Sequence, residues 1–189
     1  MAFVTEIEID QLRRSVVSFF RNPEIWFRLN PEWELLKITK IQGREPCIEF
    51  IIEVLYDRSE LQVTYQVKVE EWPGGEGFTL LLNGDSPRQI QLKFEGKGDI
   101  VNSLVHRELG EIDLEPHQQT EIVLWLKSTA DYIEISSRRS WHWRVVRYLL
   151  DKIWLRLNPT GRRVVFLIIA FELTGLVLLL GLLVAQRWL

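Results

Sequence analysis

The strongest constraint on this chain of 189 residues is a long apolar segment close to its C-terminus. The segment runs from Val164 to Ala185, reads VVFLIIAFELTGLVLLLGLLVA, and holds a single charged residue, Glu172. A helix of this length reaches about 33 Å, which is enough to cross a hydrocarbon core of about 30 Å. A buried core helix is the alternative, but such helices seldom stay apolar on every face for so long. The sequence therefore predicts one membrane span over 164–185.

Basic residues flank this segment mainly on its N-terminal side, which predicts an orientation. Within about twenty residues before the segment lie Arg144, Arg147, Lys152, Arg156, Arg162 and Arg163, whereas Arg187 alone lies after it. The excess of positive charge places the N-terminal body in the cytoplasm. The opening residues MAFVTEIEID lack a basic region followed by an apolar one, so we expect no signal peptide. We expect a single-pass protein with a short tail at 186–189.

The remaining part of the chain has the size of one ordinary domain and excludes several function classes. Its charges nearly balance, with 26 acidic and 23 basic residues in the whole chain, so no basic face for nucleic acid is expected. The single cysteine, Cys47, cannot form an internal disulfide and fits a reducing compartment. We predict no nucleic-acid partner.

Hydrophobic periodicity divides the domain into strands and helices. A strand at 3–9 precedes a helix capped by Asp10, and Asn22-Pro23 begins a second short helix that ends near Asn30. Period-two alternation over 47–56 and 60–70 predicts an antiparallel hairpin with one buried face. Further strands are expected at 78–82, 90–94, 109–114 and 121–127, followed by a helix over 140–157 and a break at 158–161.

Two local stretches resemble motifs of the START-like (SRPBCC) superfamily, which includes polyketide cyclases and Bet v 1-like proteins. Residues 22–31, NPEIWFRLNP, resemble a D-P-x-x-W-x-x-W-x-P stretch, with Leu29 in place of the second aromatic. Residues 109–116, LGEIDLEP, followed by 120–126, resemble a Y-x-L-E-P … T-x-V-x-W-x-L strand pair. The resemblance implies an α+β helix-grip fold over 1–157, in which a curved antiparallel sheet surrounds a long C-terminal helix. A linker at 158–163 and the transmembrane helix would follow.

The resemblance also implies a pocket for a hydrophobic ligand between the sheet and the long helix. The candidate lining residues are Phe50, Ile52, Val54, Tyr56, Val63, Tyr65, Val67, Phe78, Phe94 and Trp125. The alternative is that these side chains fill the space as an ordinary core. Both interpretations remain open from the sequence.

Few residues suggest catalysis. His106, His117 and His142 are expected in a loop, a turn and the start of the last helix, none at metal-ligand spacing from another. Inward strand positions are almost wholly apolar, and only Tyr56 and Tyr65 bring hydroxyl groups. We therefore expect no catalytic residue, no metal and no cofactor. A polyketide-cyclase-like enzyme is a weaker alternative, and it requires two or more polar groups that converge inside the pocket.

Tryptophan and arginine are mixed before the span, as is typical of a helix that lies near anionic head groups. The predicted membrane-surface residues are Trp141, Trp143, Arg144, Arg147, Trp154, Arg156, Arg162 and Arg163, together with Trp188 beyond the span. The alternative is a long helix whose basic face is merely solvated. We predict that membrane lipids are partners of this region.

Glu172 lies inside the predicted span, where a lone carboxylate is costly and usually has a partner. It predicts contact with a second membrane protein, unless it is simply tolerated in its protonated form.

The main hypothesis is a membrane-anchored, non-enzymatic START-like domain that binds a hydrophobic small molecule or docks on a membrane protein at the cytoplasmic surface. The runner-up is an accessory subunit of a membrane complex, assembled through the span.

Overall fold

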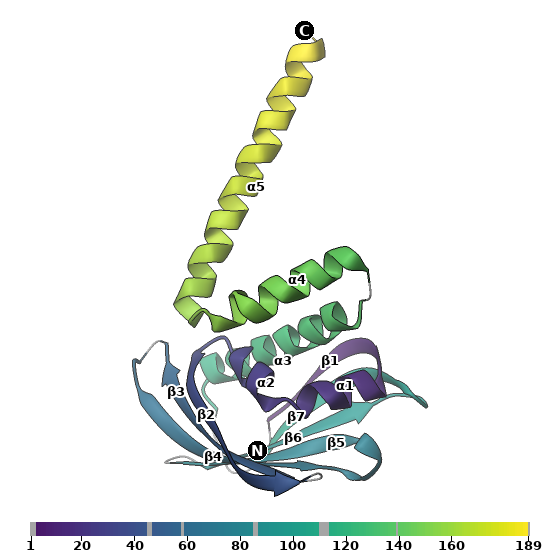
Figure 1. Ribbon diagram of the computed structural model, residues 1–189, viewed down its shortest axis with the longest axis vertical. Helices are drawn as coiled ribbons and strands as arrows, with labels where there is room; N and C mark the ends of the chain where they lie inside the picture. The colour runs from purple at the N-terminus through teal and green to yellow at the C-terminus, as the bar shows by residue number, and fades with distance from the viewer. Residues whose placement is uncertain are drawn as a thin grey trace.

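Alternating apolar residues build one seven-stranded antiparallel sheet with the order β1-β7-β6-β5-β4-β3-β2 (Figure 1). The computed structural model describes residues 3–44, 47–57, 59–84, 87–109, 114–138 and 140–188, without the side chains of 42–44 and 179–188. The strands are β1 (Phe3–Leu12), β2 (Trp33–Arg44), β3 (Cys47–Tyr56), β4 (Gln62–Glu71), β5 (Gly77–Asn83), β6 (Arg88–Glu95) and β7 (Ile100–Leu109).

Helices cover one face of this curved sheet and extend beyond it (Figure 1). They are α1 (Arg13–Phe20), α2 (Pro23–Arg28), α3 (Pro116–Ser137), α4 (Trp141–Lys152) and α5 (Pro159–Trp188), with short 3₁₀ turns η1 (Pro73–Gly75) and η2 (Trp154–Arg156). Helix α3 lies against the sheet, α4 crosses on the outer side of α3, and α5 projects away from the domain (Figure 1). The sheet and α3 together enclose the core.

The core forms because inward positions of the sheet meet one apolar face of α3. In the β3–β4 hairpin, Phe50 is opposite Val67 and Ile52 is opposite Tyr65, and all four are buried. On α3 the buried side chains recur at helical spacing: Ile122, Trp125, Leu126, Thr129, Ala130, Tyr132 and Ile133. The Trp125 ring stacks on Trp26 at 4.4 Å between centroids, and its Nε1–H donates to the Trp26 carbonyl at 2.8 Å. These contacts join α2 to α3.

Most of the expected architecture is confirmed. The first strand, the short helix that begins at Pro23, the 47–70 hairpin and the strands around 78–82 and 90–94 are all present. The α+β class with a curved antiparallel sheet is confirmed as well.

The assignment of the long helix was wrong. The segment 121–127 was predicted as a strand, but it belongs to α3. Its apolar run at 122–126 is continuous, and so short a run fits either a strand or a buried helix. The buried positions continue at spacings of three and four, which is the helical period. The 140–157 segment is helical up to Lys152 in α4, but none of the residues of α4 is buried. The helix that the sheet surrounds is therefore α3.

Other boundaries also differ. Strands β2 and β7 were not predicted, and β1 continues past Asp10, which therefore does not cap α1. The predicted strand at 109–114 overlaps β7 only at Leu109, and its residues 110–113 lie outside the described part of the chain. Helix α5 begins at Pro159, so most of the predicted linker at 158–163 is helical. Proline suits the first helical position, because its missing N–H has no partner there in any case.

Within the described residues, no helix is both long enough and apolar enough to cross a membrane. The transmembrane helix predicted over 164–185 is therefore not supported by this part of the chain. Its residues after 178 lie outside the described side chains.

Candidate functional site: the pocket at the base of α5

The predicted ligand-lining residues converge between the sheet and α3, but they pack against one another there. Eight of the ten are buried and the two others, Tyr56 and Val63, are half-buried. The Trp33 ring stacks on Tyr65 at 5.8 Å, and the Phe27 and Phe50 rings meet edge to face at 5.9 Å. A pocket beside Phe50 and Phe78 has a volume of about 10 Å³, at the lower limit for one water molecule. The arrangement at these positions is that of a packed core.

A buried polar cluster lies within this interior, and it was not expected from the sequence. The Arg88 Nε–H of β6 donates to Oε1 of Glu108 on β7, and Glu108 is only 2% exposed. Nearby, the Tyr56 and Tyr65 hydroxyls form a hydrogen bond at 3.0 Å. His106 lies in β7 rather than in a loop, and neither ring nitrogen has a partner among the described residues. The polar residues of β7 hid this strand, because inward Ser, His and Glu side chains interrupt the apolar alternation.

Burial sets the protonation states in this cluster. It lowers the pKa of His106 to about 4, and the nearby Arg88 charge acts in the same direction, so the ring is neutral at pH 7. Burial raises the pKa of Glu121 on α3, although its hydrogen bond from Asn30 Nδ2 at 3.2 Å opposes this shift.

The described residues include no group of three or more His, Cys, Asp or Glu side chains able to hold a metal ion. His117 and His142, by contrast, belong to α3 and α4.

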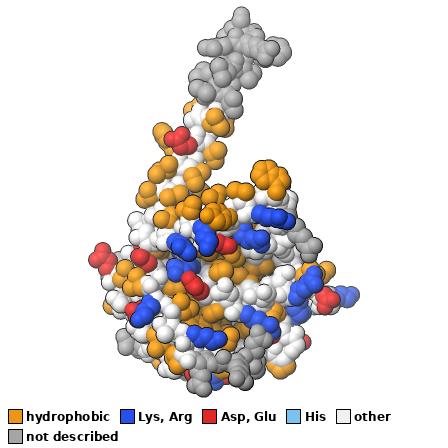
Figure 2. Space-filling model, viewed as in Figure 1, with side chains coloured by type: hydrophobic (Ala, Val, Ile, Leu, Met, Phe, Trp, Pro, Cys, Tyr) orange, Lys and Arg blue, Asp and Glu red, His pale blue; other side chains and the backbone are white. Residues whose placement is uncertain are grey.

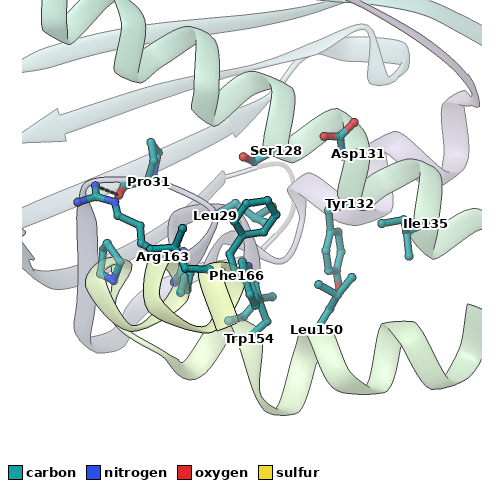
Figure 3. A pocket seen from close by; sticks show the side chains of 14 residues that line it. Leu29, Pro31, Ser128, Asp131, Tyr132, Ile135, Leu150, Trp154, Arg163 and Phe166 are labelled. Atoms are coloured by element: carbon teal, nitrogen blue, oxygen red, sulfur yellow. Dashed lines mark hydrogen bonds between the residues drawn. The ribbon is translucent and has the colours of Figure 1, made fainter. Parts of the chain in front are cut away.

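A larger and mainly apolar hollow lies elsewhere, where α5 leaves the domain (Figure 3). This junction pocket has a volume of about 570 Å³, within the range of small-molecule sites. Four elements and one loop contribute its apolar lining, namely Tyr132 and Ile135 of α3, Leu150 of α4, Trp154 and Leu155 of η2, Phe166 and Leu167 of α5, and Leu29. Ser128 and Asp131 line the α3 side.

The junction pocket exists because α4 is held across α3 by polar contacts rather than by deep packing. The Tyr132 hydroxyl donates to Asp151 Oδ1 at 2.7 Å, and Arg147 Nη1–H donates to the Ser136 carbonyl at 3.0 Å. The chain then turns at η2 before α5 begins at Pro159. A hollow therefore remains between α3, α4 and the first turns of α5.

Arg163 fixes the base of α5 to the domain. Its guanidinium contacts Asp57 Oδ2 at 3.0 Å and Glu32 Oε1 at 3.2 Å. The Thr160 hydroxyl donates to the other carboxylate oxygen of Asp57 at 2.8 Å. Arg163 was predicted as a membrane-surface residue, and its side chain is 51% exposed while it pairs with these two carboxylates of the domain.

Arg162 also lines the junction pocket, and no carboxylate lies within ion-pair distance of it in the described part of the chain. Its Nε–H donates to the Leu157 carbonyl at 3.0 Å. Burial and the neighbouring Arg28 lower its pKa to about 10. The carboxylate of Glu34 opposes this shift, while Arg28 itself pairs with Glu24 at 3.1 Å. The pocket thus holds a half-buried positive charge.

The outer faces of α4 and α5 are apolar and exposed. On α4 they carry Trp141, which is 76% exposed, and Val145, Tyr148 and Leu149, while Ile153 follows directly. On α5 the exposed side chains include Phe166, Leu167, Ile168, Phe171, Leu173, Leu176, Val177 and Leu178. Figure 2 shows hydrophobic side chains along the described part of α5 and at its base, with Lys and Arg side chains on the domain next to them.

The other predicted membrane-surface residues of α4 and η2 differ in how far their side chains are exposed. Arg144 and Arg156 are exposed, as a surface role requires. Trp143, Arg147 and Trp154 are half-buried, because Arg147 contacts Ser136 and Trp154 lines the junction pocket. Glu172 is exposed on α5, and the side chain of Trp188 lies outside the described set.

The sheet wrapped around α3 defines the fold of the domain, which is the helix-grip fold also found in START-like and polyketide-cyclase-like proteins. No protein-family model and no curated protein sequence matches the chain.

Several solved structures are similar to the domain in fold. TTHA0849 from Thermus thermophilus has a TM-score of 0.57 at 12% identity, covering 73% of this chain and 100% of its own. The Zhui aromatase/cyclase from a Streptomyces species has a TM-score of 0.55 at 9% identity, covering 73% and 96%. A START superfamily protein from Mycobacterium smegmatis has a TM-score of 0.53 at 11% identity, covering 72% and 99%. Identities this low show the fold alone.

Proposed function

We propose that this protein is a non-enzymatic START-like domain attached to the cytoplasmic face of a membrane, where it binds a hydrophobic ligand. The observation that carries the proposal is the pair of exposed apolar faces on α4 and α5, which adjoin the junction pocket. Soluble monomeric proteins rarely expose so large a continuous apolar surface. A bilayer would cover it.

The energetics of the α5 surface favour lipid contact. Burying one exposed Leu, Ile, Val or Phe side chain contributes about 1.5–3 kcal/mol. The exposed large apolar side chains on α5 between 164 and 178 therefore outweigh the cost of about 3 kcal/mol for one carboxylate, Glu172, at the centre of a membrane helix. The sequence continues this surface with LLGLLVA at 179–185. Insertion of α5 into a bilayer would cover these side chains.

With α5 inserted, α4 lies at the water–lipid boundary. It crosses the domain on the side from which α5 projects (Figure 1). Its outer apolar side chains, Trp141, Tyr148 and Leu149, then face the acyl boundary. Arg144 and Arg156 are exposed and can reach lipid phosphates. The basic excess before α5 supports a cytoplasmic domain.

Quenching by brominated lipids tests this arrangement. The full chain is reconstituted in vesicles whose phosphatidylcholine carries bromine near the head group, and its tryptophan fluorescence is compared with that in unbrominated vesicles. We expect the fluorescence intensity lost to bromine to decrease in Trp141→Phe and to be unchanged in the matched control Trp33→Phe, because Trp33 is buried in the core. Equal quenching in wild type and Trp141→Phe would show that α4 does not lie on the lipid.

The second candidate function is an accessory subunit, and the exposed carboxylate of Glu172 on α5 favours it. A partner with a polar group in its own membrane helix would remove the cost of this charge. The chain purified in mild detergent would then retain a stoichiometric membrane protein that Glu172→Leu loses and Glu172→Gln keeps in part. A monomer in that detergent contradicts this second candidate.

A further inference from the structure

We propose that the junction pocket binds an amphiphile with a single anionic head group, a carboxylate or a phosphate monoester, whose head pairs with Arg162 and whose chain lies along the apolar lining. This inference rests on the proposed function, because it identifies the class of hydrophobic ligand. It moves the ligand site from the sheet interior to the base of α5.

The position of the apolar lining is the first support. Leu150, Trp154 and Phe166 come from three different elements and surround one hollow of about 570 Å³ (Figure 3). Two of its walls, α4 and α5, carry the exposed apolar faces described above. A lipid chain can therefore pass from the bilayer into the pocket without crossing water. The packed interior, with its volume of about 10 Å³ beside Phe50, offers no comparable space at that position.

The charge of Arg162 is the second support. A guanidinium that is partly removed from water is stabilised by a carboxylate or phosphate, which it can bind in bidentate geometry. Arg162 has only the Leu157 carbonyl as a hydrogen-bond partner in the described part of the chain. Its neighbours Arg163 and Arg28 already pair with Glu32, Asp57 and Glu24. Glu34 acts on the charge of Arg162 without forming an ion pair with it, so Arg162 has no ion-pair partner among the described residues and can accept an anion.

The distribution of polar groups also orients the ligand. Asp131 and Arg163 lie on opposite sides of the pocket (Figure 3). An anionic head avoids the α3 side, where Asp131 would repel it, and stays at the first turn of α5. The head group then lies at the level where α5 leaves the domain, which is also the level of the membrane surface in the proposed function.

Native mass spectrometry of the delipidated full chain in phosphatidylcholine nanodiscs tests the inference. The probes are dodecyl phosphate, laurate, the neutral 1-dodecylglycerol and inorganic phosphate. We expect one saturable molecule of dodecyl phosphate or laurate per chain. Arg162→Gln should weaken this binding about tenfold or more, as is typical when a hydrogen-bonded charge is lost. The control Arg107→Gln removes an exposed charge on β7 and should leave it unchanged.

Three results would overturn the inference: equal binding by Arg162→Gln and wild type, equal binding of the neutral and anionic amphiphiles, or displacement by inorganic phosphate at matching concentration. Leu150→Trp fills the pocket and should abolish binding of both anionic amphiphiles, with circular dichroism confirming its fold. Vesicle flotation of the same preparations separates the two proposals. A chain that floats but binds no probe refutes the amphiphile site alone, whereas a chain that does not float refutes membrane attachment.

Discussion

His106 should make the stability of this domain fall in mild acid. The ring is 2% exposed, and its pKa of about 4 lies well below the ordinary value of 6.5. Below pH 6.5 the unfolded chain takes up a proton on this histidine, while the folded chain does not until the pH approaches 4. Because the unfolded state then binds more protons, the free energy of unfolding decreases as the pH falls through this window.

The size of the effect follows from the two pKa values. Each pH unit between them is equivalent to about 1.4 kcal/mol, so the full window removes about 3 kcal/mol. Glu121 acts in the opposite direction, since its raised pKa favours the folded state as the pH falls. A comparison with His106→Leu isolates the histidine, because Glu121 is present in both proteins.

The assay is urea denaturation of the full chain in a neutral detergent, followed by tryptophan fluorescence, at about pH 7 and about pH 4.5. Wild type should lose about 2–3 kcal/mol more than His106→Leu between these two values. Equal losses in the two proteins would refute the inference that His106 stays neutral when folded. A larger loss in His106→Leu would contradict the sign of the effect.

Three further predictions concern other contacts. Arg163→Ala should change the free energy of unfolding by less than about 1 kcal/mol but speed amide hydrogen exchange in the first turn of α5, because it removes the ion pairs with Glu32 and Asp57. The control Arg107→Ala should leave that exchange unchanged. Unaltered exchange in Arg163→Ala would contradict the inference that Arg163 holds α5 to the domain. Trp125→Ala should cost about 3–5 kcal/mol in urea denaturation, and a cost under about 1 kcal/mol would mean that its stack on α2 is not part of the core. Arg88→Met alone should lower the free energy of unfolding by about 3–5 kcal/mol, because Glu108 is left buried and unpaired. The double variant Arg88→Met/Glu108→Leu should regain most of that stability. Losses that simply add in the double variant would contradict this explanation.

Periodicity predicted the parts of the fold where one face is uniformly apolar. The hairpin of β3 and β4 was recognisable because large apolar residues recur at every second position of both strands, as Phe50 and Ile52 do in β3 and Tyr65 and Val67 do in β4. Strand β7 was missed because its inward positions include His106 and Glu108, which look like solvent-facing residues in a sequence. Helix α3 was misassigned because a seven-residue window cannot distinguish the two periods.

The junction pocket could not be predicted from the sequence, because it depends on how segments far apart in the chain pack together. The Trp and Arg mixture before the apolar segment includes Trp154 and Arg162, which line the junction pocket, and Trp141 and Arg144, which are exposed. The sequence could not show that Trp154 and Arg162 would turn inward to line a pocket, because this depends on how α4 crosses α3. Arg162 and Arg163 are adjacent in the sequence, and only the positions of Glu32 and Asp57 in the fold distinguish them.

The central claim, that α5 holds the domain to a bilayer, is tested most directly by alkaline carbonate extraction of membranes from cells that produce the intact chain. We predict that the full chain remains in the membrane pellet after extraction, and that protease added to right-side-out membranes leaves the domain intact. Release of the chain into the alkaline supernatant would contradict the account.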